Sequence, residues 1–161
     1  MVPIWLDAGY LISPSWYVGV YFQYGVVLPN NCTAASGCSG DDVRIGLEAQ
    51  YRILPEGTFD PWIGAGFGYE LASGTASGFT TSGVPATEGI SLGGFEFLHL
   101  EAGADYKVLP NLNIGPVLAF AFGEYGSISG SLDGASEPIS EPSALHMWIF
   151  LMFRGQYDLH I

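Results

Sequence analysis

Basic residues are scarce in this chain of 161 residues. Four Lys and Arg stand against 16 Asp and Glu, which gives a formal net charge of −12 at pH 7. A nucleic-acid-binding surface needs clustered basic side chains that neutralise phosphates. Because four basic residues cannot form such a cluster, the composition excludes nucleic acid as a partner.

Charged residues of either sign are also few, and long apolar runs are absent. Only 12% of the residues are charged, about half the share of an average soluble domain, and the mean hydropathy is +0.30. No apolar run reaches the roughly 18 residues of a transmembrane helix. The chain is instead rich in glycine (23 residues) and aromatics (14%), a composition that favours β-strands and tight turns.

The chain has two cysteines, Cys32 and Cys38, separated by a short segment rich in Ser, Ala and Gly. This spacing predicts a local disulfide formed in an oxidising compartment. Two free thiols are the alternative, since sequence does not fix the geometry of a bridge. No His lies near them, so we expect no metal site. No signal peptide is visible at the start, so we expect a mature form or a fragment.

Strict alternation of apolar and polar residues is the main pattern. In residues 43–53 every odd position is apolar or aromatic, and every even position is charged, polar or Gly, as in a strand with two different faces. Soluble strands usually have about five or six residues, whereas a strand that crosses a bilayer needs about nine to eleven. Seven segments of bilayer-crossing length alternate in this way: 4–12, 16–26, 43–53, 62–71, 98–108, 114–125 and 145–159.

The connections between these segments alternate in length. Short turns with Pro and Ser, Asn or Gly are expected at 13–15, 55–60 and 110–111. Long polar loops are expected at 29–42, 72–94 and 127–143. Short turns at one rim and long loops at the other are typical of outer-membrane β-barrels.

The charges indicate which face of the strands meets lipid. A soluble barrel turns its polar faces to water, but the polar faces here hold many Gly and aromatic residues and few cations. We therefore expect the apolar faces to meet lipid, where a charge costs about 2–4 kcal/mol near the midplane, and the polar faces to line the interior. The interior charges expected on this basis are Asp7, Arg44, Glu48, Arg52, Glu70, Glu101, Asp105, Lys107, Arg154 and Asp158.

Aromatic residues gather near the ends of the expected strands. Two aromatic girdles, one at each membrane interface, are expected of a spanning barrel. The aromatics assigned to the interface at the short-turn rim are Tyr10, Trp16, Trp62, Tyr106 and Tyr157.

Residues 43–51 and 61–69, and the alternating end at 153–159, look like strands of a known family. The chain resembles the small bacterial outer-membrane β-barrels of the eight-stranded type, which include the outer membrane protein A, X and W groups. The resemblance implies one domain over residues 1–161, an antiparallel up-and-down transmembrane β-barrel of the all-β class, with outer-membrane lipid as its partner.

Only seven strands are visible, whereas single-chain bacterial barrels have an even number. We expect that an N-terminal strand is missing, or that another copy supplies it; strained closure of seven strands is the third option. An unpaired strand edge would be costly in lipid.

His99, Glu101 and His146 are the candidates for chemistry, with Ser127, Ser129 and Ser143 at a similar height to His146. No spacing supports a catalytic triad, so we expect no enzyme, no cofactor and no metal. An eight-stranded interior is filled by side chains, which predicts no wide channel. The leading hypothesis is a structural or surface-displaying barrel with acidic loops. The alternatives are a narrow transporter of small or hydrophobic solutes, a self-assembling barrel that donates strands, and a lipid-modifying enzyme at the rim.

Overall fold

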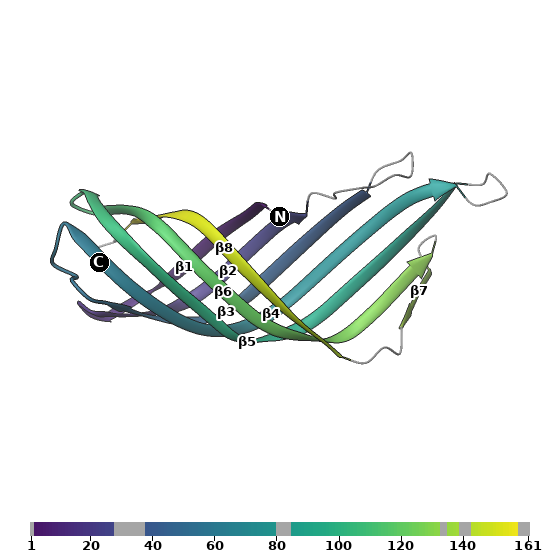
Figure 1. Cartoon of the computed structure of the whole chain (residues 1–161), viewed down its shortest axis with the longest axis horizontal. Coiled ribbons are helices and arrows are strands. Elements are labelled where there is room, and N and C mark those ends of the chain that lie inside the picture. The colour runs from purple at the N-terminus through teal and green to yellow at the C-terminus, as the bar shows by residue number, and fades with distance from the viewer. Residues whose placement is uncertain (1, 28–37, 80–84, 133–134, 139–142, 158–161) are drawn as a thin grey trace.

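The computed structural model describes residues 2–27, 38–79, 85–132, 135–138 and 143–157, and this part of the chain is all β. It forms one antiparallel sheet (Figure 1). The strands are β1 (Val2–Ser13), β2 (Trp16–Val27), β3 (Cys38–Arg52), β4 (Phe59–Phe79), β5 (Pro85–Leu109), β6 (Leu112–Leu132), β7 (Ala135–Pro138) and β8 (Ala144–Tyr157).

Seven of these strands are long and run up and down in chain order. Each of β1 to β6 pairs with the next, and β8 pairs with β6 over Leu112 to Tyr125. The short β7 pairs with the far end of β6, from Ser129 to Leu132. β7 and β8 therefore share one side of β6, and the seven strands expected from the alternation are confirmed.

The expected short turns are present at one end of the sheet. Pro14 and Ser15 join β1 to β2, where the Trp16 amide donates to Ser13 Oγ at 3.2 Å. Pro110 and Asn111 join β5 to β6. These residues favour tight turns because Pro fixes φ and Ser or Asn can bond the nearby backbone.

Two of the expected long loops are largely strand, which corrects the prediction. β4 continues to Phe79 and pairs with β5 from its first residue, Pro85, while β6 continues to Leu132. Residues 72–78 of β4 are Ser, Thr, Gly and Ala, so the sequence reads as loop although the backbone remains paired. The 21 residues of β4 span about 70 Å at about 3.3 Å per residue, far more than the bilayer core of about 30 Å.

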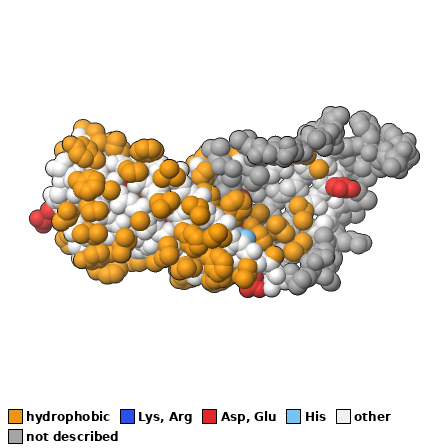
Figure 2. Space-filling model, in the orientation of Figure 1, with side chains coloured by type: hydrophobic (Ala, Val, Ile, Leu, Met, Phe, Trp, Pro, Cys, Tyr) orange, Lys and Arg blue, Asp and Glu red, His pale blue; other side chains and the backbone are white. Residues whose placement is uncertain are grey.

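The two faces of the sheet are inverted relative to a soluble protein. Leu47 is 51% exposed and Phe153 is 86% exposed, whereas Arg44 and Glu70 are completely buried. Hydrophobic side chains cover most of the visible surface over the end of the sheet that carries the short turns (Figure 2). The predicted orientation, with apolar side chains outside and charged side chains inside, is therefore present in the structure.

The sheet curls but does not close. In the described ranges, β1 pairs only with β2, β8 pairs only with β6, and no pairing joins β1 to β8. The two edges still approach each other inside the curl, where the rings of Trp5 and Phe150 lie 6.3 Å apart. Within the same ranges, no helix is long and apolar enough to cross a membrane.

Candidate functional site

Arg44 lies at the centre of a buried charge network, in the part of the curled sheet that is farther from the short turns (the upper part). Its guanidinium forms ion pairs with Asp42 at 3.0 Å, Glu70 at 3.1 Å and Glu96 at 3.3 Å. The rings of Trp148 and Phe150 lie 5.3 and 5.2 Å from its Cζ atom. A cation held by three carboxylates and two aromatic faces bridges β3, β4, β5 and β8.

Glu70 receives several further donors beside Arg44. Tyr125 Oη donates to it at 2.5 Å, Trp148 Nε1 donates at 3.1 Å, and His146 Nε2 lies 2.6 Å away. The ring of His146 stacks on Tyr125 with centroids 3.8 Å apart. These contacts join β4 to β6 and β8, and they offset the desolvation of a fully buried carboxylate.

His99 continues the network toward the short turns. Its Nδ1 atom lies 2.8 Å from Glu96 and its Nε2 atom lies 3.3 Å from Glu101. Its ring packs against those of Trp5 and Tyr21, at centroid distances of 5.0 and 4.8 Å, and those two rings also stack on each other at 5.4 Å. An imidazole with a carboxylate at each nitrogen is arranged to hold the charged, doubly protonated form.

A second cationic centre, Arg154, lies nearer the short turns. It donates to Asp105 at 2.7 Å and to Gln50 at 2.9 Å, and its Cζ atom lies 3.8 Å from the ring centroid of Trp62. Gln50 also donates to Glu48 at 3.1 Å and to Glu101 at 3.5 Å. Polar contacts therefore run without a break from His146 to Asp105 along the interior.

Arg52 forms a separate pair at the short-turn end. Its Nε atom donates to Asp60 at 2.5 Å, and the other oxygen of Asp60 accepts the Leu54 amide at 3.1 Å. This carboxylate fixes the connection between β3 and β4 at the point where the chain reverses.

A bulge in β5 brings Glu96 into the network. Phe97 and Leu98 are both exposed, and the pairing with β4 and β6 shifts between Glu96 and Leu98. A bulge adds one residue and so reverses which positions face inward. Before it the even residue Glu96 faces inward, and after it the odd residues His99 and Glu101 do.

Sequence reasoning missed three buried carboxylates. Asp42 and Asp60 were expected in connections, and Glu96 lies between the expected loop 72–94 and the expected strand 98–108, but all three are at most 3% exposed. Asp42 and Asp60 could have been found by extending the alternation of β3 and β4 past their apolar residues. The adjacent pair Phe97–Leu98 was the available signal for the bulge.

The structure brings most of the expected interior charges together, with three exceptions. The residues that line the interior are Arg44, Glu48, Arg52, Glu70, Glu101, Asp105 and Arg154. Lys107 is exposed because it lies close to the end of β5, and this corrects its assignment to the interior. Asp7 faces inward as expected but is exposed, because it lies on the edge strand β1; Trp5 Nε1 donates to it at 2.6 Å. Asp158 lies outside the described residues.

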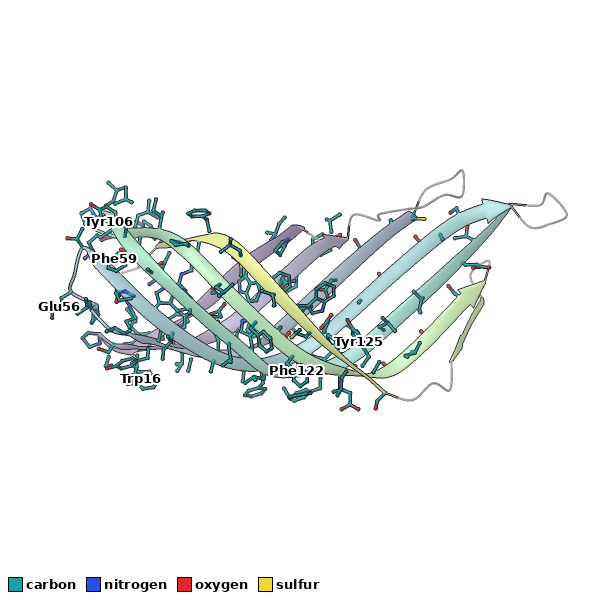
Figure 3. All side chains as sticks on the ribbon, in the orientation of Figure 1. Trp16, Glu56, Phe59, Tyr106, Phe122 and Tyr125 are labelled. Atoms are coloured by element: carbon teal, nitrogen blue, oxygen red, sulfur yellow. The ribbon has the colours of Figure 1, made fainter. Side chains whose placement is uncertain are left out.

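Four of the five expected interface aromatics project outward: Tyr10, Trp16, Tyr106 and Tyr157. Trp16, Tyr106 and Phe59 can be followed at the end that carries the short turns (Figure 3). Trp62 is a correction, since it is 1% exposed and shares the inward face of β4 with Glu70. The expected disulfide involves Cys32, which lies outside the described residues, so the Cys32–Cys38 bridge stays a prediction.

The polarity of both faces reverses along β4. On the outward face, Leu71 is followed by Ser73 and Thr75; on the inward face, Glu70 is followed by Ala72 and Gly74. Before residue 72, toward the short turns, the outward face of β4 is apolar and the inward face is charged. After residue 72 the outward face carries hydroxyl groups and the inward residues are small and apolar.

The neighbouring strands reverse at the same level. Their pairing with β4 aligns Ser73 with Asp41 of β3 and with Ser91 of β5, while Ser91 in turn pairs with Ser129 of β6. Hydroxyl groups on this outward surface meet across strands, as between Ser39 and Thr75 at 2.8 Å and between Ser77 and Thr87 at 3.4 Å. On the inward side the same strands carry Ile90, Leu92 and Ile128. Backbone pairing continues through this level, so the reversal lies within one continuous sheet.

Two of the candidates for chemistry, His146 and Ser127, make polar contacts in the structure. His146 contacts Glu70, and Ser127 Oγ donates to the carbonyl of Gly93 at 3.2 Å. Of the residues that the structure describes, no group of three or more His, Cys, Asp and Glu is arranged to hold a metal ion.

No protein-family model, curated protein or solved structure matches the chain.

Proposed function

We propose that this chain forms the wall of a transmembrane β-barrel in the bacterial outer membrane, with a filled interior and a structural or surface-displaying role. The observation that carries the proposal is the reversal of polarity on both faces of one continuous sheet near residue 72 of β4. An apolar outside with a charged inside suits lipid, and a hydroxylated outside suits water.

The amount of exposed apolar surface supports a lipid environment. Leu151 and Phe153 are more than 80% exposed. Other large hydrophobic side chains, each at least 37% exposed, lie on the outward faces of all seven long strands. Burial of one such side chain is worth about 1.5–3 kcal/mol. Soluble monomers rarely expose contiguous apolar patches larger than a few hundred Å².

The filled interior supports a barrel that does not conduct. Arg44, Trp148 and Phe150 lie together across the upper part of the curl, and Arg154 lies over Trp62 in the lower part. Barrels of about eight strands have an interior that side chains can fill. A narrow transport path would have to pass Arg44 and Arg154, which carboxylates hold in the interior.

The extended ends of β4, β5 and β6 supply the displayed surface. They carry the hydroxyl-rich outward face beyond the apolar belt. On this proposal the Cys32–Cys38 bridge would form at this side of the membrane, in an oxidising compartment.

Reconstitution into lipid vesicles tests the proposal. We expect the refolded chain to float with vesicles, to resist extraction at high pH, and to give no large stable single-channel currents. A monodisperse chain that stays in water without detergent would overturn the membrane assignment. Large stable currents would overturn the filled interior alone. The double variant Trp62→Ala, Arg154→Ala serves as a positive control, since it empties the lower interior and should raise vesicle leakage.

A further inference from the structure

The two edges of the sheet run in the same direction. Each long strand reverses the chain, and with seven of them β1 and β8 both run toward the end that carries the short turns. Every strand pairing in the described part of the sheet is antiparallel. A direct β1–β8 pair would be the one parallel pair, whereas a single strand between them would be antiparallel to both.

The interior contacts limit the width of the seam between β1 and β8. Trp5 on β1 lies 6.3 Å from Phe150 on β8, measured between ring centroids. Arg154 on β8 reaches Asp105 on β5 and Gln50 on β3. Opening the curl to admit the seven-stranded sheet of a second copy would break these contacts. The seam therefore has room for about one strand.

Exposure on β1 marks the position of the seam. Asp7 and Gly9 face inward but are exposed, whereas inward residues at the middle of β3 and β6, such as Glu48 and Ala119, are buried. In lipid the unpaired backbone groups along both edges would each cost several kcal/mol. A strand in the seam would cover Asp7 and pair both edges.

We infer that the seam binds one further β-strand, antiparallel to β1 and β8, with apolar residues outward and small residues inward. The inference rests on the proposed function, because lipid is what makes open edges costly. The inward residues must be small because Trp5 and Phe150 already occupy the space beneath the seam. β6 follows the same rule, with Ala119 and Ala121 inward between the large side chains of β5 and β8.

A synthetic peptide with the sequence of residues 117–124 is the probe, since in β6 this segment runs antiparallel to β8 and its inward residues are Val117, Ala119, Ala121 and Gly123. The matched control peptide has the substitutions Ala119→Trp and Ala121→Trp. Each peptide is added while the chain refolds into vesicles. Hydrogen exchange of β1 and β8 is measured by mass spectrometry, together with the stoichiometry.

A cysteine pair on the two edges measures the width directly. Leu6→Cys and Leu151→Cys, in a chain with Cys32→Ser and Cys38→Ser, place one thiol on the outward face of each edge. A disulfide needs Cα atoms within about 7 Å, whereas edges separated by one strand lie about 10 Å apart. The peptide should therefore slow disulfide formation at least tenfold.

The inference predicts a 1:1 complex, at least tenfold slower exchange in both β1 and β8, and no such effects with the control peptide. Protection of one edge only, equal action of both peptides, or a disulfide that forms equally fast with the probe would overturn it. If these outcomes occur while the chain still floats with vesicles, the strand inference fails and the proposed function stands. A chain that does not enter vesicles contradicts the proposed function instead.

Discussion

The guanidinium of Arg44 on β3 lies 3.3 Å from the carboxylate of Glu96 on β5. Without the bulge at Phe97 and Leu98, Glu96 would share the outward face of β5 with Leu98 and Leu100. With Phe97 and Leu98 both present, the bulge therefore decides whether this carboxylate meets an arginine or faces outward.

Deletion of Leu98 should remove the bulge and leave Glu96, His99 and Glu101 all facing inward, because regular alternation then runs through this part of β5. We expect only a small loss in the free energy of unfolding. Glu96→Ala removes one partner from the buried ionic cluster and should cost about 3–5 kcal/mol. Urea-induced unfolding in vesicles measures both variants. A loss for the deletion as large as that for Glu96→Ala would show that the bulge itself is needed to hold the cluster.

Arg44→Met should leave Asp42, Glu70 and Glu96 buried without their common cation. The expected loss is again about 3–5 kcal/mol, measured by chemical unfolding in vesicles. Lys107→Met removes an exposed cation and should change stability by no more than about 0.5 kcal/mol. Adding Glu96→Gln to Arg44→Met should restore part of the loss. Arg44→Met and Lys107→Met with the same stability would show that the network is not needed.

Gly103→Ala should disturb the lower interior. A Cβ atom at Gly103 would lie 2.6 Å from the ring of Trp62, and Trp62 supports Arg154. Overpacking of this kind costs about 1–3 kcal/mol. Near-ultraviolet circular dichroism and unfolding report the change. Gly126→Ala is the control, since nothing lies within 4 Å of its added Cβ; a loss of the same size there would refute the explanation.

Charge substitutions on the outward face of β4 should depend on height. Ile63→Lys places a cation in the apolar belt and should cost about 2–4 kcal/mol if that belt contacts lipid. Thr75→Lys lies above the reversal of polarity and should have almost no effect. Folding yield in vesicles and unfolding free energy measure both. An equal cost at Thr75 and Ile63 would show that the lipid-facing part of the outward face does not end near residue 72.

The alternation of apolar and polar residues was sufficient to predict the seven long strands and their two faces. It worked because the side-chain period of a strand is two and because the outward faces are apolar in every long strand. The pattern failed where the outward residues become Ser and Thr, as in β4 after Leu71. There the polarity of both faces changes while the backbone stays paired, and hydropathy reads the strand as loop.

The network could be predicted only in part. The residues Arg44, Glu70 and Arg154 lie on regular alternating segments, so their inward position followed from the sequence. Glu96 depends on a bulge, and Asp60 depends on how a turn folds back onto Arg52. The carboxylate partners of Arg44 come from three strands and lie up to 52 residues away along the chain, and local sequence carries no information about such contacts.

On the proposed function, the outward face of the sheet passes from lipid to water near residue 72. Single cysteines at Phe67, Leu71, Ser73 and Thr75, in a chain without Cys32 and Cys38, would carry a fluorophore in vesicles. Quenching by brominated lipid and by an aqueous quencher is then compared at each position. We predict strong lipid quenching at Phe67 and Leu71 and a change to aqueous quenching by Thr75. Equal aqueous quenching at all four positions would contradict the account.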